Sequence, residues 1–258
     1  MRLKDRVAVV TGGGRGIGRA IALAFAQAGA DVVVTARTAS EIDSVAAEIE
    51  RLGRKGVALS VDLSDREAIH ACVASIVTQF PTVDILVNNA GVGGAQNPNP
   101  VAQYDDDFWD MSLFVNLTAP YLLMKAFLPK MIEQNWGRII NIASRAAKRG
   151  ALNRSAYSVS KHGLVGLTRS AALEVATNGV TVNAICPGPI RTAMLTRLLQ
   201  YRADLQGITL EEVEQSVNPM KRLLEPEEVA EMAVYLASEL AGGVSGQALN
   251  IDGGNVMH

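Results

Sequence analysis

Short apolar runs alternate with longer amphipathic stretches along the chain. Residues 7–10 read Val-Ala-Val-Val, and residues 17–28 carry apolar side chains at helical spacing before Gly29. Apolar strands separated by helices in this way are typical of a parallel sheet covered on both faces. The pattern predicts strands at residues 7–10, 31–35, 57–62, 84–88, 138–143, 180–185 and 247–251, and helices at 17–28, 41–52, 65–80, 155–177 and 226–238. We therefore expect an α/β fold with a doubly wound, seven-stranded parallel sheet.

Three segments are less regular. Residues 106–133 form one long helix or a broken one, with Pro120 and Pro129 as possible breaks. Residues 91–103 are rich in Gly, Pro and Asn and should form a loop. A segment at about 188–220 follows the end of a strand, where open α/β sheets bind ligands, and we expect a substrate loop there. It mixes apolar residues with arginines: Met194, Leu195, Leu198 and Leu199 with Arg191, Arg197 and Arg202.

Composition is ordinary for a folded protein and adds little beyond exclusions. Hydrophobic residues make up 48% of the 258 residues and charged residues 19%, which is too apolar for disorder. No shift in composition divides the chain, so we expect a single domain over residues 1–258. The 24 Lys and Arg against 26 Asp and Glu give a net charge of −2, which argues against a nucleic-acid partner.

Location and metal content follow from what the sequence lacks. Only Cys72 and Cys186 are present, too few for a disulfide framework and compatible with a reducing compartment. The three histidines show no metal-ligand spacing, so we expect no metal. The first residues are charged and the apolar run at 7–10 is short, so we expect neither a targeting segment nor a membrane partner, and a cytoplasmic location.

A glycine cluster stands between the first predicted strand and the first predicted helix. Residues 11–18 read Thr-Gly-Gly-Gly-Arg-Gly-Ile-Gly. Glycines here allow a tight turn and the close approach of a pyrophosphate, which the N-terminus of the following helix attracts. The spacing differs from Gly-x-Gly-x-x-Gly, and a plain turn is the alternative, but its place in a repeating α/β chain favours a Rossmann dinucleotide site. A P-loop is excluded because no Gly-Lys-Ser/Thr follows.

The end of the second predicted strand indicates which dinucleotide binds. NAD sites usually carry an acid there, but this chain reads Thr-Ala-Arg-Thr at 35–38 and has no acid before Glu41. Arg37 and Arg15 could together bind a 2′-phosphate. The alternative is that both are solvated surface residues. We therefore expect NADP(H), with NAD(H) possible.

Further motifs follow in one order along the chain, and together they resemble the classical short-chain dehydrogenases/reductases over nearly the whole length. The matching positions are the loop at 11–18, Asp62, the Asn-Asn-Ala-Gly of residues 88–91, Asn116, Ser144, the Tyr157-x-x-x-Lys161 pair, and Pro187-Gly188 with Thr192. Each motif alone is weak, and their order and separations carry the resemblance. It implies a single-domain Rossmann fold with helices on both faces of the sheet, and a hydride transfer between a nicotinamide and a ketone or secondary alcohol.

The resemblance also implies roles for individual residues. The catalytic set would be Asn116, Ser144, Tyr157 and Lys161. The cofactor-binding residues would be Gly12, Gly14, Arg15, Gly16, Ile17, Gly18, Arg37, Thr38, Asp62, Leu63, Asn89, Ala90, Gly91, Tyr157, Lys161, Pro187, Gly188, Ile190 and Thr192.

The spacing of Tyr157 and Lys161 has a chemical reason. Residues four apart share one face of a helix, and a nearby ammonium group lowers the pKa of a phenol. Such a phenol can give a proton to a carbonyl oxygen or take one from an alcohol. The alternative is an ordinary amphipathic surface helix.

Two further polar residues have structural alternatives as well. Ser144 follows a predicted strand and could donate to the substrate oxygen, or it could be a cap or turn serine. In the family an asparagine like Asn116 holds a water that links the lysine to solvent, and a buried structural asparagine is the alternative.

Other residues near the motifs have simpler interpretations. We expect His162 to be packed or at the surface, Cys186 to be a small buried apolar residue, and residues 105–107 to cap the helix that follows. Arg145 and Arg154 could contact an anionic substrate or lie at the surface or a subunit contact.

The resemblance is strongest to 3-oxoacyl-(acyl-carrier-protein) reductase-like members. The mixed segment after residue 188 permits an acyl chain on an anionic carrier without requiring it. The alternatives are an alcohol, sugar or small-ketone dehydrogenase using NAD(H), a non-catalytic NADP-binding regulator, and an epimerase or dehydratase that does not consume its cofactor. Family members of this kind are mostly homotetramers joined through two long helices, here at 107–133 and 155–177.

Overall fold

The fold was analysed in a computed structural model. It describes the backbone of residues 1–258 and the side chains of all residues except Met194, Arg197, Leu198, Tyr201 and Arg202. Met194, Arg197, Leu198 and Arg202, which the sequence analysis named in the mixed apolar and basic substrate segment, therefore lie outside the described side chains.

Seven parallel strands form one sheet in the order β3-β2-β1-β4-β5-β6-β7. The direction of strand addition reverses beside β1, which pairs with β2 on one side and β4 on the other. The predicted seven-stranded doubly wound sheet is confirmed. The strands are β1 (Val7–Thr11), β2 (Asp31–Ala36), β3 (Gly56–Ser60), β4 (Ile85–Asn88), β5 (Gly137–Ile142), β6 (Val180–Pro187) and β7 (Ala248–Ile251).

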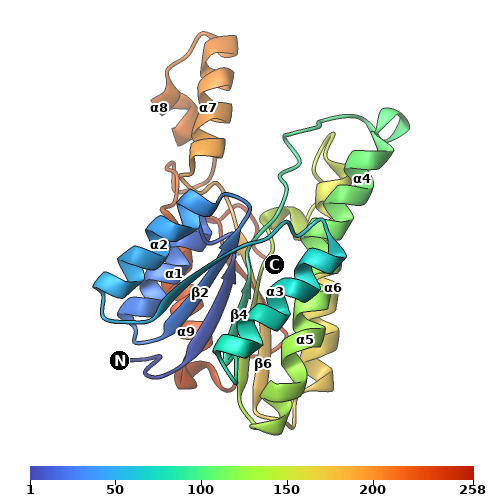
Figure 1. Cartoon of the computed structure of the whole chain (residues 1–258). Helices are drawn as coiled ribbons and strands as arrows, with labels where there is room; N and C mark the ends of the chain where they lie inside the picture. The colour runs from blue at the N-terminus through green and yellow to red at the C-terminus, as the bar shows by residue number, and fades with distance from the viewer.

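Helices cover both faces of this sheet (Figure 1). One layer contains α1, α2 and α9, and the opposite layer contains α3, α5 and α6. The α-helices are α1 (Gly16–Gln27), α2 (Ala39–Arg51), α3 (Arg66–Gln79), α4 (Asp106–Leu113), α5 (Ala119–Glu133), α6 (Ser155–Glu174), α7 (Ala193–Gln206), α8 (Leu210–Gln215) and α9 (Pro226–Ala237). The short elements are the 3₁₀ turns η1 (Val101–Gln103), η3 (Arg145–Ala147) and η4 (Glu239–Ala241), and the π-turn η2 (Phe114–Thr118).

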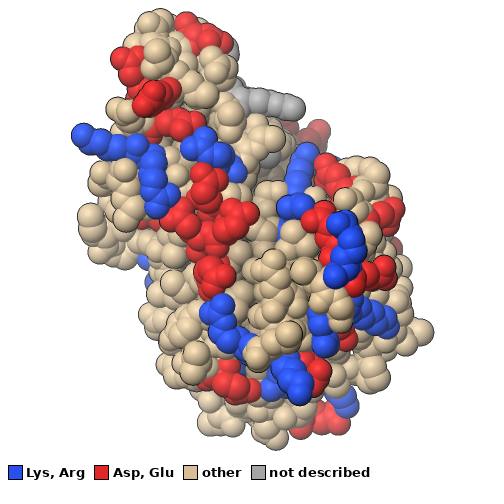
Figure 2. Space-filling model, turned by 90° about the vertical axis from the view of Figure 1, so that its left-hand side faces the viewer, with Lys and Arg blue, Asp and Glu red and all other residues tan. Residues whose placement is uncertain are grey.

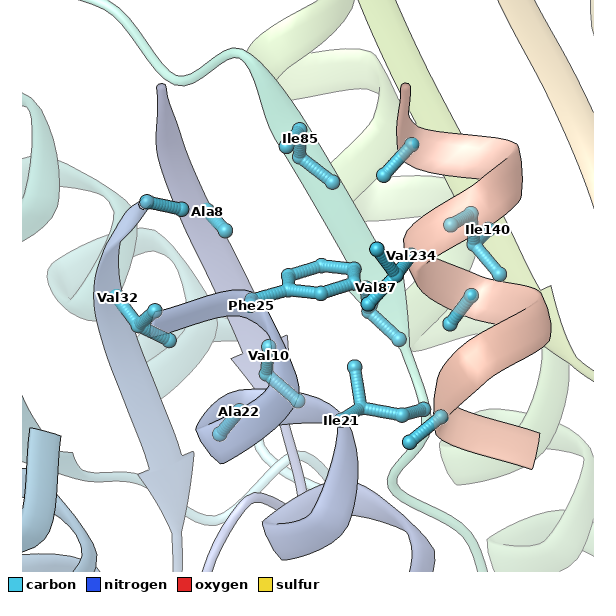
Figure 3. Packing of buried hydrophobic residues seen from close by; sticks show 14 of the residues in the cluster. Ala8, Val10, Ile21, Ala22, Phe25, Val32, Ile85, Val87, Ile140 and Val234 are labelled. Carbon is cyan, nitrogen blue, oxygen red and sulfur yellow. The ribbon is translucent and has the colours of Figure 1, made fainter. Parts of the chain in front are cut away.

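Alternate residues of each central strand face the two layers, since successive side chains of a strand point to opposite faces. Val9 packs in the cluster on the α3, α5 and α6 side, whereas Val10 packs on the α1, α2 and α9 side. The ring of Phe25 extends from α1 toward Val87 of β4 and Val234 of α9 (Figure 3). Phe25 is fully buried, and replacing such a ring with alanine costs about 3–5 kcal/mol of stability. This packing fixes α1, whose N-terminus faces the candidate site.

The long helical stretch is interrupted once. The π-turn Phe114–Thr118 separates α4 from α5. Pro120 lies in the first turn of α5, two residues after the π-turn, so one of the two predicted positions stands beside the interruption. Pro129 lies inside α5 without ending it, so no break occurs at that proline.

By length and composition alone, the stretch Asp106–Glu133 could cross a membrane, with a mean hydropathy of 1.4 over its most apolar window. The sequence analysis did not identify it. In the fold, Leu123, Met124 and Phe127 of this stretch are buried against the sheet. A core helix passes the same test of length and composition, so this is weak evidence for a membrane span.

The segment after β6 contains helices that the sequence analysis did not predict. Helices α7 and α8 project from the body of the molecule (Figure 1). Thr192 caps α7 with its side chain, and Thr209 forms a reciprocal capping box with Glu212 at the start of α8. An isolated β-bridge between Ile190 and Leu224 closes the base of this segment.

Candidate active site

A cavity of about 490 Å³ opens at the carboxyl ends of β4, β5 and β6. This volume falls in the usual range for small-molecule sites, and the edge is the one where doubly wound sheets bind ligands. Ten of the predicted site residues line it: Ile17, Asn89, Gly91, Ser144, Tyr157, Lys161, Pro187, Gly188, Ile190 and Thr192.

The glycine loop lies against the end of β4. Gly12 has a φ of 63°, in the left-handed region that favours glycine. A Cβ on Gly18 would overlap the carbonyl oxygen of Gly12 and the side chain of Asn89. The amide of Asn89 donates to the carbonyl oxygens of Thr11 (2.9 Å) and Gly12 (3.1 Å), and its backbone N–H donates to the Thr11 hydroxyl (3.0 Å). Ala90 N–H donates to the same hydroxyl, so residues 89 and 90 hold the loop in place.

The N-terminus of α1 fits a phosphate group. The N-cap residue Arg15 makes no side-chain cap hydrogen bond, and the first turn of α1 contains no acid. By contrast, Asp65 and Asp105 cap α3 and α4 with their carboxylates. The first N–H groups of α1 and the positive end of its dipole are therefore available to an anion.

The residues predicted for the adenosine end lie apart from the cavity. Arg15 and Arg37 are exposed, and a guanidinium nitrogen of Arg15 lies 3.6 Å from the carboxylate of Glu41. Hydrogen bonds from Ser64 hold the pKa of Asp62 below its usual range, and the charge of Arg37 adds a smaller effect in the same direction. Arg37 and Asp62 are thus neighbours, whereas Glu41 partly neutralises Arg15.

Other cofactor candidates contribute mainly backbone. The side chain of Leu63 is buried in the core, which leaves its main chain for a ligand. Gly14 lies against Glu41. Thr38 is the exposed N-cap residue of α2 and makes no side-chain cap hydrogen bond. Thr192 places its methyl group 3.3 Å from the position of a Cβ on Gly16, so the substrate segment contacts the glycine loop there.

Ser144 and Tyr157 meet at the end of β5. Ser144 follows β5 and is the N-cap of η3, where its hydroxyl accepts a hydrogen bond from Ala146 N–H at 3.1 Å. The same hydroxyl interacts with the phenol of Tyr157, in the first turn of α6. Ser144 therefore has the cap role that the sequence offered as an alternative, and it also faces the tyrosine.

The pKa of Tyr157 shifts opposite to the sequence argument. Burial raises this pKa, and the Ser144 hydroxyl, Arg154 and Arg145 oppose the rise. Burial also lowers the pKa of Lys161 to about 8. The ammonium group donates to Ile142 O at 2.9 Å and lies 5.9 Å from the centre of the Tyr157 ring. The lysine shares a helix face with the tyrosine as predicted, but the arginines, not Lys161, are the charges that lower the tyrosine pKa.

Asn116 lies in the π-turn and is fully buried, outside the cavity lining. Its side-chain oxygen accepts from Val92 N–H (2.9 Å), and its amide donates to Val92 O (3.1 Å) and to the Ser160 hydroxyl (3.1 Å). A Cβ on Gly91 would lie 2.8 Å from that side-chain oxygen and 3.5 Å from the Lys161 nitrogen. These contacts fit the alternative of a structural asparagine, and the water-binding role stays a prediction.

Comparisons with known proteins agree with this geometry. A family model described as enoyl-(acyl carrier protein) reductase matches residues 12–255. The 3-oxoacyl-(acyl-carrier-protein) reductase FabG of Vibrio harveyi is 38% identical over 100% of both chains. The chain belongs to the classical short-chain dehydrogenases/reductases. It is an oxidoreductase acting on alcohol and carbonyl groups, as predicted.

Solved structures of other short-chain dehydrogenases/reductases share the fold. An actinorhodin polyketide ketoreductase with NADPH superimposes with a TM-score of 0.90, at 36% identity and 98% coverage of both chains. An NAD⁺-bound xylitol dehydrogenase has a TM-score of 0.90, at 30% identity, and covers 98% of this chain and 100% of its own.

Sequence reasoning missed a residue in the middle of the Tyr157/Lys161 motif of this dehydrogenase/reductase. The Ser160 hydroxyl accepts from Asn116 and donates to Tyr157 O at 2.9 Å. It therefore links the π-turn to the helix that presents the tyrosine. Its place one residue before Lys161 was the available signal, but a helical serine is too common to stand out.

The simpler predictions hold for the neighbouring residues. Asp105 caps α4 through Phe108 N–H at 2.7 Å. His162 is exposed and its ring contacts Ser158 O. Cys186 is fully buried, and burial raises the pKa of its thiol. Among the described residues, no group of three or more His, Cys, Asp or Glu could hold a metal ion, and the expectation of no metal stays a prediction.

Charges of both signs are interspersed on the surface of this dehydrogenase/reductase. Figure 2 shows Lys and Arg beside Asp and Glu on the face it presents, whereas the projecting part at the top shows Asp and Glu. A nucleic-acid surface would require a continuous basic patch. This face and the net charge of −2 give no support for such a partner.

Proposed function

We propose that the protein is an NADP(H)-dependent reductase of ketones, with 3-oxoacyl thioesters as its substrates. The observation that carries the proposal is that Ser144, Tyr157 and Lys161 line the same cavity as Asn89, Gly188 and Thr192, beside the glycine loop. A carbonyl oxygen between Ser144 and Tyr157 would have two hydroxyl donors within reach.

The raised pKa of Tyr157 suits proton donation. At neutral pH the phenol is protonated, because burial favours its neutral form. It can give its proton to the oxygen of the carbonyl as the alcohol forms, while Ser144 orients that oxygen. When bound, the nicotinamide supplies the hydride. Lys161 would hold the ribose beside it and stay largely charged at pH 7, since its pKa is about 8.

The cofactor would extend from the cavity across the glycine loop. The available N–H groups of α1 fit its pyrophosphate. Arg37, with Arg15, would bind the 2′-phosphate, which supports NADP(H) over NAD(H). The NADPH in the actinorhodin ketoreductase supports this choice, and the NAD⁺ in xylitol dehydrogenase keeps NAD(H) as the second candidate. The pairing of Arg15 with Glu41 favours that second candidate.

We also propose one cofactor-binding domain over residues 1–258, with its substrate segment at about 188–220, working in the cytoplasm as a homotetramer. Exposed apolar side chains on α5 and α6 support association through these helices. Tyr121 is 44% exposed and Leu173 is 81% exposed.

The test follows oxidation of NADPH and NADH against a panel of carbonyl compounds. The panel contains a 3-oxoacyl thioester, a small ketone, a ketose and an enoyl thioester, the last because the family model is described as an enoyl reductase. We expect the 3-oxoacyl thioester with NADPH to react fastest. Tyr157→Phe should lower kcat by about 100-fold or more, whereas Tyr235→Phe, on α9 away from the cavity lining, should leave it unchanged.

Three outcomes would contradict the proposal. A faster reaction with NADH would overturn the cofactor assignment. A faster reaction of the enoyl thioester, with Tyr157→Phe still active, would overturn the carbonyl mechanism. Cofactor binding without oxidation of either nicotinamide by any compound would favour a non-catalytic regulator.

A further inference from the structure

The substrate side of the cavity is strongly positive. Arg145, Arg149 and Arg154 line it together with Lys161, and no Asp or Glu is among its described lining residues. The remaining walls there are small or apolar, for example Val92 and Leu195. Charges in such a cavity are less screened than on an open surface.

Arg154 is held in place beside the reacting group. It is half-buried and is the N-cap residue of α6, three positions before Tyr157. The Cβ and Cδ of Arg154 lie 2.9 and 3.1 Å from where a Cβ on Gly94 would be. The loop after β4 therefore covers the stem of Arg154, and only a glycine at position 94 allows this close approach. Among the charged groups acting on Tyr157, Arg154 has the largest effect in lowering its pKa.

Neither Arg154 nor Arg149 has a carboxylate within 4.0 Å in the part of the chain that the structure describes. Arg191 and Arg222, near the base of the substrate segment, are both paired with glutamates. A half-buried guanidinium beside a cavity retains a large capacity for charge-assisted hydrogen bonds.

The cofactor has its own candidate groups elsewhere. The available N–H groups of α1 and the guanidinium groups of Arg15 and Arg37 belong to the glycine loop and the end of β2. Arg149 and Arg154 come from the segment between η3 and α6, the segment that ends at Tyr157. An anion bound by Arg149 and Arg154 would therefore belong to the substrate and not to the cofactor, at a position beyond the reacting carbonyl group.

We propose that the substrate carries an anionic group, which Arg154 binds a few atoms from the reacting carbonyl and which Arg149 binds at the mouth of the cavity when the substrate is longer. This inference rests on the carbonyl reduction of the proposed function and takes the substrate class to be anionic oxo compounds, which include 3-oxoacyl thioesters with a phosphate on the carrier arm and also short oxo acids. The anion is the carboxylate of a short oxo acid or the phosphate of a carrier arm on an acyl thioester. Arg154 suits the first because it lies near Tyr157, and exposed Arg149 suits the second.

The experiment compares each anion with a neutral partner of the same shape. The first pair is 3-oxobutanoate and its methyl ester, and the second is a 3-oxoacyl thioester of phosphopantetheine and one of pantetheine. Each is assayed with Arg154→Gln, Arg149→Gln and the control Arg51→Gln, whose side chain is exposed on α2. Calorimetry with 3-hydroxybutanoate and its methyl ester in the presence of NADPH measures binding without turnover, because an alcohol and a reduced nicotinamide cannot react with each other.

We expect Arg154→Gln to lower kcat/KM for 3-oxobutanoate by about 10–100-fold, the range for a lost charge-assisted hydrogen bond. The kcat/KM for the methyl ester should fall by less than about threefold, because the ester is affected only through the change at Tyr157. If the phosphate is the anion, Arg149→Gln should instead lower kcat/KM for the phosphopantetheine thioester more than for the pantetheine thioester. Arg51→Gln should change nothing.

Equal losses of kcat/KM for 3-oxobutanoate and its methyl ester in Arg154→Gln would overturn the inference and leave the proposed function standing. A weaker affinity of Arg154→Gln for NADP⁺ would do the same, because Arg154 would then bind the cofactor. If no carbonyl compound is reduced, the proposed function fails, and calorimetry still decides the inference. Selective loss of 3-hydroxybutanoate binding in Arg154→Gln would then support it, and binding that is equal in wild type and variant would overturn it.

Discussion

At the residue scale, Lys161 has an unfavourable position for its charge. Its side chain is almost fully buried, and burial lowers its pKa from 10.5 to about 8. The ammonium group keeps one described hydrogen bond, to Ile142 O. Such a group costs stability while it is charged, and the cost disappears as pH rises.

We therefore predict that Lys161→Met is more stable than the wild type by about 2 kcal/mol at pH 7, after allowing for the lost hydrogen bond. Between pH 8 and pH 10 the unfolded wild type binds more protons than the folded one, so wild-type stability gains on the variant as pH rises. Urea unfolding at pH 7, 8, 9 and 10 measures this gap. Exposed Lys125→Met is the control, and a gap that does not narrow with pH would contradict the prediction.

A second prediction separates Arg37 from Arg15. Arg15 is paired with Glu41, whereas no carboxylate of the described residues lies within ion-pair distance of Arg37. Arg37→Ala should therefore raise the Kd for NADPH by about 10–100-fold and leave that for NADH unchanged. Arg15→Ala should have a smaller effect. Quenching of nicotinamide fluorescence measures both values, and equal losses for NADPH and NADH would refute a 2′-phosphate contact.

Residue identity could be predicted from sequence more easily than residue environment. Ser144, Tyr157 and Lys161 stand at recognisable positions, and the structure gathers them at one cavity. The direction of the Tyr157 pKa could not be predicted, because it depends on burial and on Arg154, whose orientation the fold decides. The contacts of Asn116 with Val92 and Ser160 were likewise hidden, since they join segments far apart in the chain.

At the element scale, Arg191 connects the projecting helices to the body. Its guanidinium makes two hydrogen bonds to Glu214 of α8, at 3.0 and 3.2 Å, and one to Glu225, the N-cap of α9, at 2.9 Å. The side chains of Arg191, Glu214 and Glu225 are all at least partly exposed, so these ion pairs add little to the free energy of unfolding. The geometry nevertheless fixes the base of the segment.

We predict that Arg191→Ala changes global stability by less than about 1 kcal/mol but speeds proteolysis and amide exchange within α7 and α8 several-fold. KM should rise more than kcat falls, since the segment borders the cavity through Thr192 and Leu195. Exposed Arg2, which pairs with Glu231, provides the control Arg2→Ala. Equal exchange rates in wild type and variant would show that the ion pairs do not hold the segment.

Elements with strong periodicity were predicted from sequence, and elements shaped by long-range contacts were not. The strand at residues 7–10 is continuous and apolar, which is why β1 (Val7–Thr11) was found almost to the residue. Helices α7 and α8 carry mixed polar and apolar residues, and their caps were not recognised before the structure. The π-turn brings Asn116 to Val92, a contact between distant segments that no local pattern contains.

At the scale of the whole molecule, the carboxyl ends and the amino ends of the strands carry different features. The carboxyl edge carries the cavity, whereas the amino edge carries a cluster around Trp136, with Arg6 and Arg138 lying 3.5 and 4.5 Å from its ring centre. Arg138 is 3% exposed and donates to the carbonyl oxygens of Gly137, Gly179 and Ser238. These contacts join β5 to the segments before β6 and after α9.

We predict that Arg138→Leu lowers the free energy of unfolding by about 2–3 kcal/mol, because it leaves buried carbonyl oxygens without donors. At a temperature where the variant stays folded, its kcat/KM should remain within about twofold of wild type, since the cluster lies at the edge opposite the site. Urea unfolding and steady-state kinetics on the same samples check both parts. A large loss of kcat/KM in folded variant would show that the two edges are coupled.

The π-turn Phe114–Thr118 has a consequence for how the gene could vary. A π-turn accommodates one residue more than an α-turn, so deleting a single codon there would let α4 and α5 join as one regular helix. Because the π-turn already absorbs the extra residue, α4 and α5 would keep their phase, and the deletion would remove only the widened turn that presents Asn116 to Val92 and Ser160. Each residue of a regular α-helix turns the chain by about 100°, so a one-residue deletion inside α5 would instead rotate one part of that helix against the other and should be tolerated far less than one at the π-turn.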